Sequence, residues 1–100
     1  MREQPAIPVE QAAEAHARHI VAGDRMALQQ DCTAPVLQEP PDLYAQLETL
    51  AIERYAVLGH ARIGFQHVFK IRYVGTTTVT LHHRLGIVDG QWRVLESERV

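Results

Sequence analysis

The sequence has little cysteine and no long hydrophobic run. Cys32 is the only cysteine among 100 residues, which excludes an internal disulfide and a cysteine-based zinc motif. The apolar stretches are only a few residues long, far below the ~20 residues of a membrane-spanning helix. The start, MREQPAIPVEQ, lacks the apolar segment of a secretory signal. We therefore expect a soluble cytoplasmic protein that binds no membrane.

The sequence also lacks a basic run and the common cofactor-binding motifs. The ten basic residues are spread along the chain and the formal net charge is −2, so nucleic acid is not an expected partner. There is no glycine-rich phosphate loop and no nucleophile elbow, so we expect no cofactor. With 46% hydrophobic and 22% charged residues, the chain has the balance of a globular protein. Its length predicts a single domain spanning residues 1–100.

The first half of the chain has helical periodicity. Residues 8–22 predict an amphipathic helix, with Gly23 suited to its C-terminal cap. Asp24 is the expected N-cap of a second, shorter helix, and Asp42 that of a third helical segment. One stripe of the first helix is expected to face the core, and it consists of Val9, Ala13, His16 and Ile20.

From about Ile52 onward, hydrophobic and polar residues alternate, which indicates β-strands. Three segments each place a mainly hydrophobic set on one face: Phe65, His67, Phe69, Ile71 and Tyr73; Val79, Leu81, His83, Leu85 and Ile87; and Trp92, Val94, Glu96, Glu98 and Val100. The opposite face mixes arginine with aliphatic residues, a composition tolerated at subunit interfaces. Its members are Val68, Lys70, Arg72, His82, Arg84, Arg93 and Leu95.

The turns predict how these strands pair. Asp89-Gly90 is typical of a two-residue type I′ hairpin, and such a turn pairs Ile87 with Trp92, Leu85 with Val94 and His83 with Glu96. A three-residue loop at 75–77 keeps the hydrophobic faces together in the preceding hairpin and pairs Tyr73 with Val79, Ile71 with Leu81, Phe69 with His83 and His67 with Leu85. The predicted cross-sheet row is Phe69–His83–Glu96. A tight turn at Gly64-Phe65 would add His60 to it.

Two short motifs carry a family resemblance. Ala22-Gly23-Asp24 followed by Ala27-Leu28, and Gly90-Gln91-Trp92-Arg93-Val94, resemble the helix junction and the final hairpin of the nuclear-transport-factor-2-like superfamily. This resemblance covers nearly the whole chain and implies a cystatin-like α+β cone, in which a curved antiparallel sheet wraps two or three N-terminal helices. It also implies a cavity for small, largely apolar molecules and frequent dimers through the outer sheet face. No residue here matches the catalytic aspartate of the family's isomerases; Asp31 lies nearest in position.

Three functions follow from these patterns. The first is binding of a small, largely apolar molecule between the first helix and the sheet. The second is an isomerase, dehydratase or cyclase in which His83, oriented by Glu96, moves a proton; the same pair can instead be a surface cross-strand pair. The third is a homodimeric interaction module with a filled core. Expected pocket residues are His16, His67, Phe69, Tyr73, Leu85, Trp92 and Val94.

Metal binding is not expected. His16 and His19 stand three residues apart on one helix, a spacing that can seat a metal, but the sequence indicates no third ligand.

Overall fold

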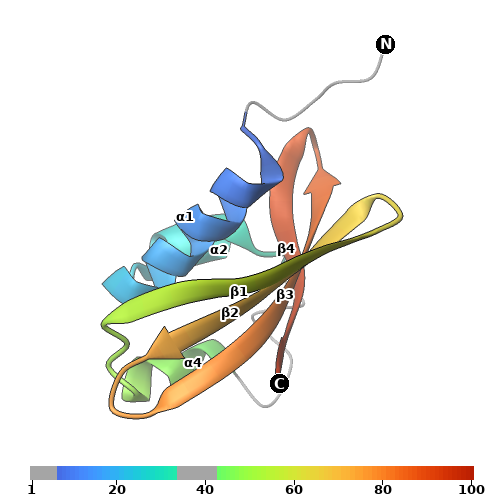
Figure 1. The fold of residues 1–100 in the computed structure, drawn as a ribbon. Helices are drawn as coiled ribbons and strands as arrows, with labels where there is room; N and C mark the ends of the chain where they lie inside the picture. The colour runs from blue at the N-terminus through green and yellow to red at the C-terminus, as the bar shows by residue number, and fades with distance from the viewer. Residues whose placement is uncertain (1–6, 34–42) are drawn as a thin grey trace.

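The computed structural model describes residues 7–33 and 43–100. The described chain has the predicted α+β architecture: three helices precede a curved, four-stranded antiparallel sheet, and α1 lies along one face of it (Figure 1). The helices are α1 (Val9–Ala22), α2 (Arg25–Asp31) and α4 (Leu43–Thr49). The strands, adjacent in chain order, are β1 (Arg54–Ile63), β2 (Gln66–Val74), β3 (Thr78–Val88) and β4 (Gln91–Arg99).

The first two helices form as the sequence predicts. The predicted stripe of α1 is buried, and Gly23 ends the helix in the left-handed conformation, with φ 66°. The Asp24 carboxylate accepts a hydrogen bond from the Ala27 backbone N–H and so caps α2. The predicted cap Asp42 lies outside the described residues. None of the described helices has the length and apolar character needed to span a membrane.

The hairpin formed by β2 and β3 has the predicted register. Its pairs are Tyr73 with Val79, Ile71 with Leu81, Phe69 with His83 and His67 with Leu85. The loop between the two strands packs against the chain that follows α4. The backbone N–H of Thr76 donates to the Leu50 carbonyl at 2.7 Å, and a Cβ added to Gly75 would lie 2.2 Å from the same oxygen. Only glycine therefore fits at position 75.

The hairpin of β1 and β2 brings His60 opposite Phe69, as the tight-turn alternative predicts. Phe65 lies in that turn and is 77% exposed, so it is not part of the inward face. A bulge at Leu58 shifts the register farther along β1. The histidine therefore joins the row that crosses the sheet.

The hairpin of β3 and β4 follows the prediction only near its turn. Asp89 and Gly90 both have positive φ, 52° and 76°, as a type I′ turn requires. Ile87 pairs with Trp92 and Leu85 with Val94. Beyond these pairs, a β-bulge inserts Leu95, and the register shifts by one residue.

The predicted pairing of His83 with Glu96 is therefore wrong. His83 lies opposite Ser97, and Glu96 lies opposite Arg84 on the other face of the sheet. The cause is local: Leu95 lies over Gly86, where an added Cβ would come within 2.6 Å of its Cδ1 atom. Glycine provides the space for the bulged residue, and the bulge turns Ser97 inward.

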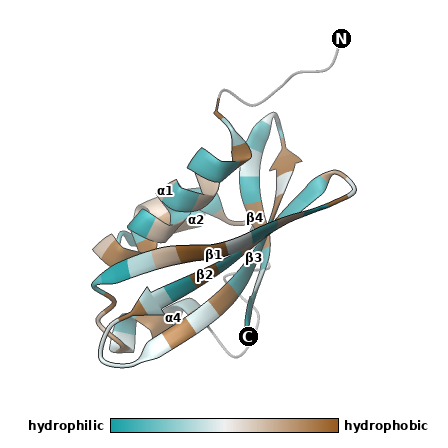
Figure 2. Ribbon diagram, viewed as in Figure 1, coloured by the Kyte–Doolittle hydropathy of each residue, from teal (hydrophilic) through white to brown (hydrophobic). Residues whose placement is uncertain are grey.

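The core lies between α1 and the inner face of the sheet. Figure 2 shows hydrophobic bands separated by more hydrophilic ones along the strands. Hydrophobic side chains of the sheet form one core cluster with side chains of α1 and α4. Two histidines lie among them. The largest fully buried side chains are Tyr73, Phe69, Ile71, Leu81, Leu85, His16, His83 and Val94.

Candidate functional site: a pocket joined to a buried hydrogen-bond chain

A pocket of about 260 Å³ opens between α1, the end of α2 and the hairpin of β3 and β4. This volume is just below the range of about 300–1,000 Å³ that is typical of small-molecule sites. Most of the described lining is apolar, and Asp31 is the only carboxylate among these described residues. The lining residues are Ile7, Ala12, Ala15, His16, Asp31, Leu85, Gly90, Gln91, Trp92 and Val94.

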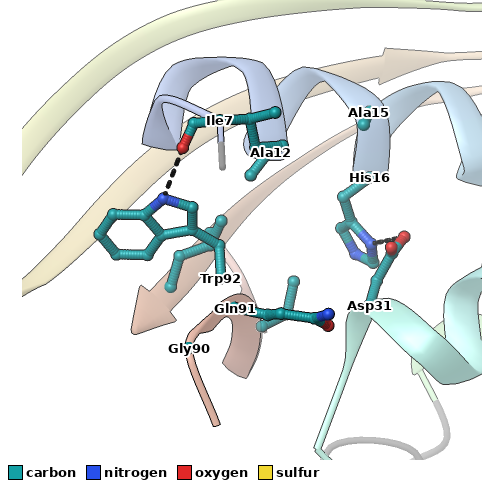
Figure 3. Close-up of a pocket in the computed structure, with 10 residues that line it drawn as sticks. Ile7, Ala12, Ala15, His16, Asp31, Gly90, Gln91 and Trp92 are labelled. Atoms are coloured by element: carbon teal, nitrogen blue, oxygen red, sulfur yellow. Dashed lines mark hydrogen bonds and ion pairs between the residues drawn. The ribbon is translucent and has the colours of Figure 1, made fainter. Parts of the chain in front are cut away.

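The two ends of the pocket differ in polarity (Figure 3). At one end the Trp92 indole N–H donates to the Ile7 carbonyl at 3.1 Å, which holds the indole ring against the start of α1. At the other end His16 points toward Asp31, and the side chain of Gln91 extends toward them from the hairpin. The pocket thus has an aromatic end and a carboxylate end.

Asp31 is held by two histidines of α1. It follows the buried Leu28 by three residues and therefore lies on the same side of α2. Its Oδ2 atom lies 2.8 Å from Nδ1 of His16 and 2.6 Å from Nδ1 of His19. No donor among the described residues is hydrogen-bonded to its other oxygen, Oδ1. The histidine pair that could seat a metal by its spacing is thus engaged with one carboxylate oxygen.

The Asp31 carboxyl is ionised at neutral pH. Partial burial raises its pKa, but the hydrogen bonds and charges of His16 and His19 together outweigh burial and bring the pKa below the ordinary value. Because an ionised carboxylate only accepts hydrogen bonds, both histidines donate from Nδ1.

From His16 a continuous chain of hydrogen bonds runs into the core. Nε2 of His16 lies 2.8 Å from the Tyr44 hydroxyl, which lies 2.9 Å from Oγ of Ser97. Ser97 in turn lies 2.7 Å from Nδ1 of His83, and Nε2 of His83 lies 2.8 Å from the Tyr73 hydroxyl. The chain therefore links α1, α4, β4, β3 and β2 through side chains alone.

The number of hydrogens on each group assigns a direction to this chain. In the His16 tautomer that carries one ring hydrogen, at Nδ1, this atom donates to Asp31 and Nε2 accepts from the Tyr44 hydroxyl. Tyr44 then accepts from Ser97 and from the Cys32 thiol, the latter at 3.6 Å. Ser97 accepts from Nδ1 of His83, which accepts from Tyr73 at Nε2. Every hydrogen points along the chain toward Asp31.

The opposite direction would leave a buried hydrogen without an acceptor. If His83 donated to Tyr73, the hydroxyl hydrogen of Tyr73 would have no acceptor among the described residues, although that side chain is fully buried. In the assigned direction the Tyr73 hydroxyl hydrogen has an acceptor, Nε2 of His83. The orientation is thus favoured by hydrogen-bond satisfaction alone.

The pKa values of the buried members agree with neutral groups. Burial, with His16 and His82 nearby, lowers the pKa of His83 well below its ordinary value. Burial raises the pKa of both Tyr44 and Tyr73 well above the tyrosine value. Burial also raises the pKa of the Cys32 thiol to about 12. At neutral pH the chain is therefore uncharged from Tyr73 to Tyr44 and ends at one anion.

The structure brings four of the predicted pocket residues together and separates the others. His16, Leu85, Trp92 and Val94 line the pocket. Phe69 and Tyr73 are buried in the core and are not among the residues that line the pocket. His67 bonds to His60, with 2.7 Å between Nδ1 and Nε2, and its ring packs against the edge of Trp92 outside the lining.

His83 and Glu96, the predicted acid–base pair, lie on opposite faces of the sheet. Both ring nitrogens of His83 are hydrogen-bonded within the core, and its exposed fraction is 1%. Glu96 forms an exposed ion pair with Arg84 at 3.4 Å. The group that orients His83 is Ser97, so this geometry gives no support to proton transfer by His83 under the control of Glu96.

Sequence reasoning missed Asp31, Tyr44 and Ser97. A signal exists for Asp31, because its helical spacing from Leu28 places it on the buried side of α2, next to the histidines of α1. Tyr44 has no comparable signal, since a tyrosine in a short helix is most often a packing residue. Ser97 is assigned to the outer face by strict alternation, and only the bulge brings it inward.

Comparison with known proteins adds no relative: no protein-family model and no curated protein matches this chain.

Proposed function

We propose that the protein binds a small, largely apolar molecule in the pocket between α1, α2 and the hairpin of β3 and β4. The observation that carries this proposal is the lining itself. Ile7, Ala12, Ala15, Leu85 and Val94 provide apolar walls, and Trp92 provides an aromatic surface at one end. Small-molecule sites typically combine apolar walls with a few polar groups that orient the ligand, and Asp31 and Gln91 are such groups here.

The resemblance to the nuclear-transport-factor-2-like superfamily supports the same proposal. Members of that superfamily use the space between the first helix and the sheet for small molecules, and the pocket proposed here is lined by residues of α1 and of the sheet. The proposal nevertheless depends on the lining and not on the resemblance, because Asp31, Gln91 and Trp92 would orient a ligand in any fold.

NMR titration with a neutral aromatic probe, 2-phenylethanol, tests the proposal. Trp92 is the only tryptophan, so its indole N–H gives a single, assignable signal at the pocket. We expect saturable shifts of this signal and of the backbone amides of Ala15 and Val94. The expected Kd is of millimolar order, as for a probe of about nine non-hydrogen atoms.

A pocket-filling variant provides the specificity control. Ala15→Leu places a larger side chain in the pocket and should abolish the saturable shifts. Ala22→Leu makes the same change at an exposed position of α1 and should leave them unchanged. The proposal would be wrong if Ala15→Leu still bound the probe at this site. It would also be wrong if the unaltered protein bound no aromatic probe of this size.

A second candidate function is homodimerisation through the outer face of the sheet. On that face the basic side chains Lys70, Arg72 and Arg84 of β2 and β3 lie beside Glu96 and Glu98 of β4. A two-fold axis across the sheet can align the basic side of one copy with the acidic side of the other. Light scattering after size exclusion tests this proposal: Glu96→Lys with Glu98→Lys should shift a dimer to monomer, and a monomeric unaltered protein would contradict it.

A further inference from the structure

We propose that the pocket selects molecules that present a hydrogen-bond donor, and above all an ammonium group, to Oδ1 of Asp31. This inference rests on the proposed function, because it names the ligand class of the same pocket. It would make the natural ligand a small amine with an aromatic or aliphatic body, such as an arylalkylamine. Neither the composition nor the resemblance predicts this preference.

The first argument is the direction of the buried hydrogen-bond chain. Every hydrogen of the chain points toward Asp31, and both His16 and His19 donate to its Oδ2 atom. The histidine rings therefore keep the carboxylate anionic and in a fixed orientation, while Oδ1 has no donor among the described residues. A ligand group that meets this oxygen must donate a hydrogen bond, since an acceptor there would be repelled.

The second argument is that the other polar groups of the pocket are already engaged. Both ring nitrogens of His16 are hydrogen-bonded, and the indole N–H of Trp92 donates to the Ile7 carbonyl. Neither group is free to donate to a ligand anion. The side-chain amide of Gln91 is the remaining polar lining group, and it is neutral.

The third argument is the local charge. Asp31 is the only carboxylate among the described residues that line the pocket, and its pKa is below the ordinary value. The guanidinium of Arg93 is nearby, but it donates to the Gln30 carbonyl and to Oε1 of Gln91, and it does not line the pocket. A cationic group inside the pocket therefore meets the carboxylate in a partly desolvated setting, where charge-assisted hydrogen bonds are strongest.

Three probes of similar size test the inference: 2-phenylethylammonium, 2-phenylethanol and phenylacetate. They are titrated at pH 8, where imidazoles are in general uncharged, with the Trp92 indole signal as readout. We expect the ammonium probe to bind about tenfold more tightly than the alcohol, and the anion more weakly than either. Equal affinities of amine and alcohol, or a preference for phenylacetate, would overturn the inference.

Two variants test whether the preference for the amine over the alcohol depends on Asp31. Asp31→Asn removes the negative charge but keeps an acceptor for His16, so the preference of amine over alcohol should fall to about twofold or less. Asp89→Asn removes the same charge from the neighbouring turn, where asparagine also suits positive φ, and should leave the preference unchanged. A preference that survives in Asp31→Asn would contradict the inference.

The two proposals fail in different ways. If none of the three probes binds, the pocket is not a ligand site and the proposed function fails with the inference. If the alcohol binds and the amine shows no advantage, only the inference fails. If Asp31→Asn does not fold, the ¹³C shift of the Asp31 carboxyl in the unaltered protein decides: the ammonium should change it much more than the alcohol does, and equal responses would refute the contact.

Discussion

The two hairpins that share β3 differ in regularity, although both have turns that the sequence identifies. Between β2 and β3 the pairs run without interruption from Val74–Thr78 to His67–Leu85. Between β3 and β4 the pairing is regular for four pairs and then passes a bulge at Leu95. A turn therefore determines which residues pair only as far as the next bulge in the strand. The hydrogen-bond partners of the buried polar side chains come from both hairpins.

His83 is hydrogen-bonded to one residue from each of the two hairpins. Its Nε2 atom accepts from Tyr73 of the regular hairpin, and its Nδ1 atom donates to Ser97 beyond the bulge. In the regular hairpin, the strict alternation of inward and outward residues is enough to place Tyr73 beside His83. In the bulged hairpin, Ser97 faces His83 only because the extra residue Leu95 shifts the register by one.

Single-residue deletions should separate the two hairpins most strongly. Deletion of His82 in β3 would make Leu81 and His83 neighbours, so both could not face inward, and one part of the strand would turn outward. We expect a loss of at least about 5 kcal/mol of unfolding free energy, enough to unfold a small domain. Deletion of Leu95 should retain every pair, because it removes only the extra residue.

Urea unfolding followed by circular dichroism measures both variants. Deletion of Leu95 should cost about 1–3 kcal/mol, mainly from lost contact with Gly86, and should leave a folded protein. If both deletions lowered the free energy of unfolding equally, Leu95 could not be an extra residue that is removable without disturbing the other pairs of β3 and β4.

Acidification should test the neutral state of His83. Because burial lowers its pKa in the folded state, the unfolded chain binds more protons below pH about 6.5. The contribution of His83 to stability is therefore complete above that pH and declines as pH falls, by up to about 1.4 kcal/mol per unit until the folded-state pKa is reached. Urea unfolding at successive pH values from 8 to 5 should show this slope.

The replacement His83→Gln is the control for the pH experiment. Glutamine can keep one of the two hydrogen bonds but does not titrate, so the variant should be less stable and its stability should fall less steeply between pH 6.5 and 5. An unchanged slope would assign the effect to other histidines.

Ser97→Ala should break the chain on the bulged side. It leaves the Nδ1–H of His83 without an acceptor and removes a donor to Tyr44, which should cost about 1–3 kcal/mol. The ¹⁵N shift of His83 Nδ1 should change with it, and thermal or urea unfolding gives the energetic cost. No change in either quantity would contradict the assigned chain.

Glu96→Gln should have the smallest effect. Its carboxylate pairs with Arg84 at the surface, and such pairs contribute little. We expect a change within about 0.5 kcal/mol and an unchanged ¹⁵N shift of His83. A larger response of His83 to this substitution than to Ser97→Ala would restore the pairing that strict alternation predicts.

Much of the fold was predictable because it depends on local patterns. The helical stripe of α1, the caps Gly23 and Asp24, and the turns at Asp89-Gly90 and 75–77 each follow from a few neighbouring residues. These features in turn predict that His16 faces the sheet and that His83 lies beside Phe69. The α+β architecture follows from the order of the two kinds of periodicity.

The partners in the site were less predictable because they depend on contacts between distant segments. The bulge forms where Leu95 meets Gly86 across the hairpin, and neither residue alone indicates a bulge. Tyr44 reaches His16 and Ser97 from α4, 28 and 53 residues away in sequence. The alternation of residues predicts which side of each strand faces inward. It does not predict which side chains of other helices and strands are hydrogen-bonded to that side.

The hydrogen bond between Trp92 and Ile7 has a consequence for the timing of folding. It joins residues 85 positions apart, so the segment that leads into α1 obtains this contact only when β4 has been made. Ser97, which completes the buried chain, comes later still. Closure of such distant contacts is slow compared with helix formation. The pocket should therefore be among the last parts of the molecule to form, and a chain that ends before β4 would have helices but no binding site.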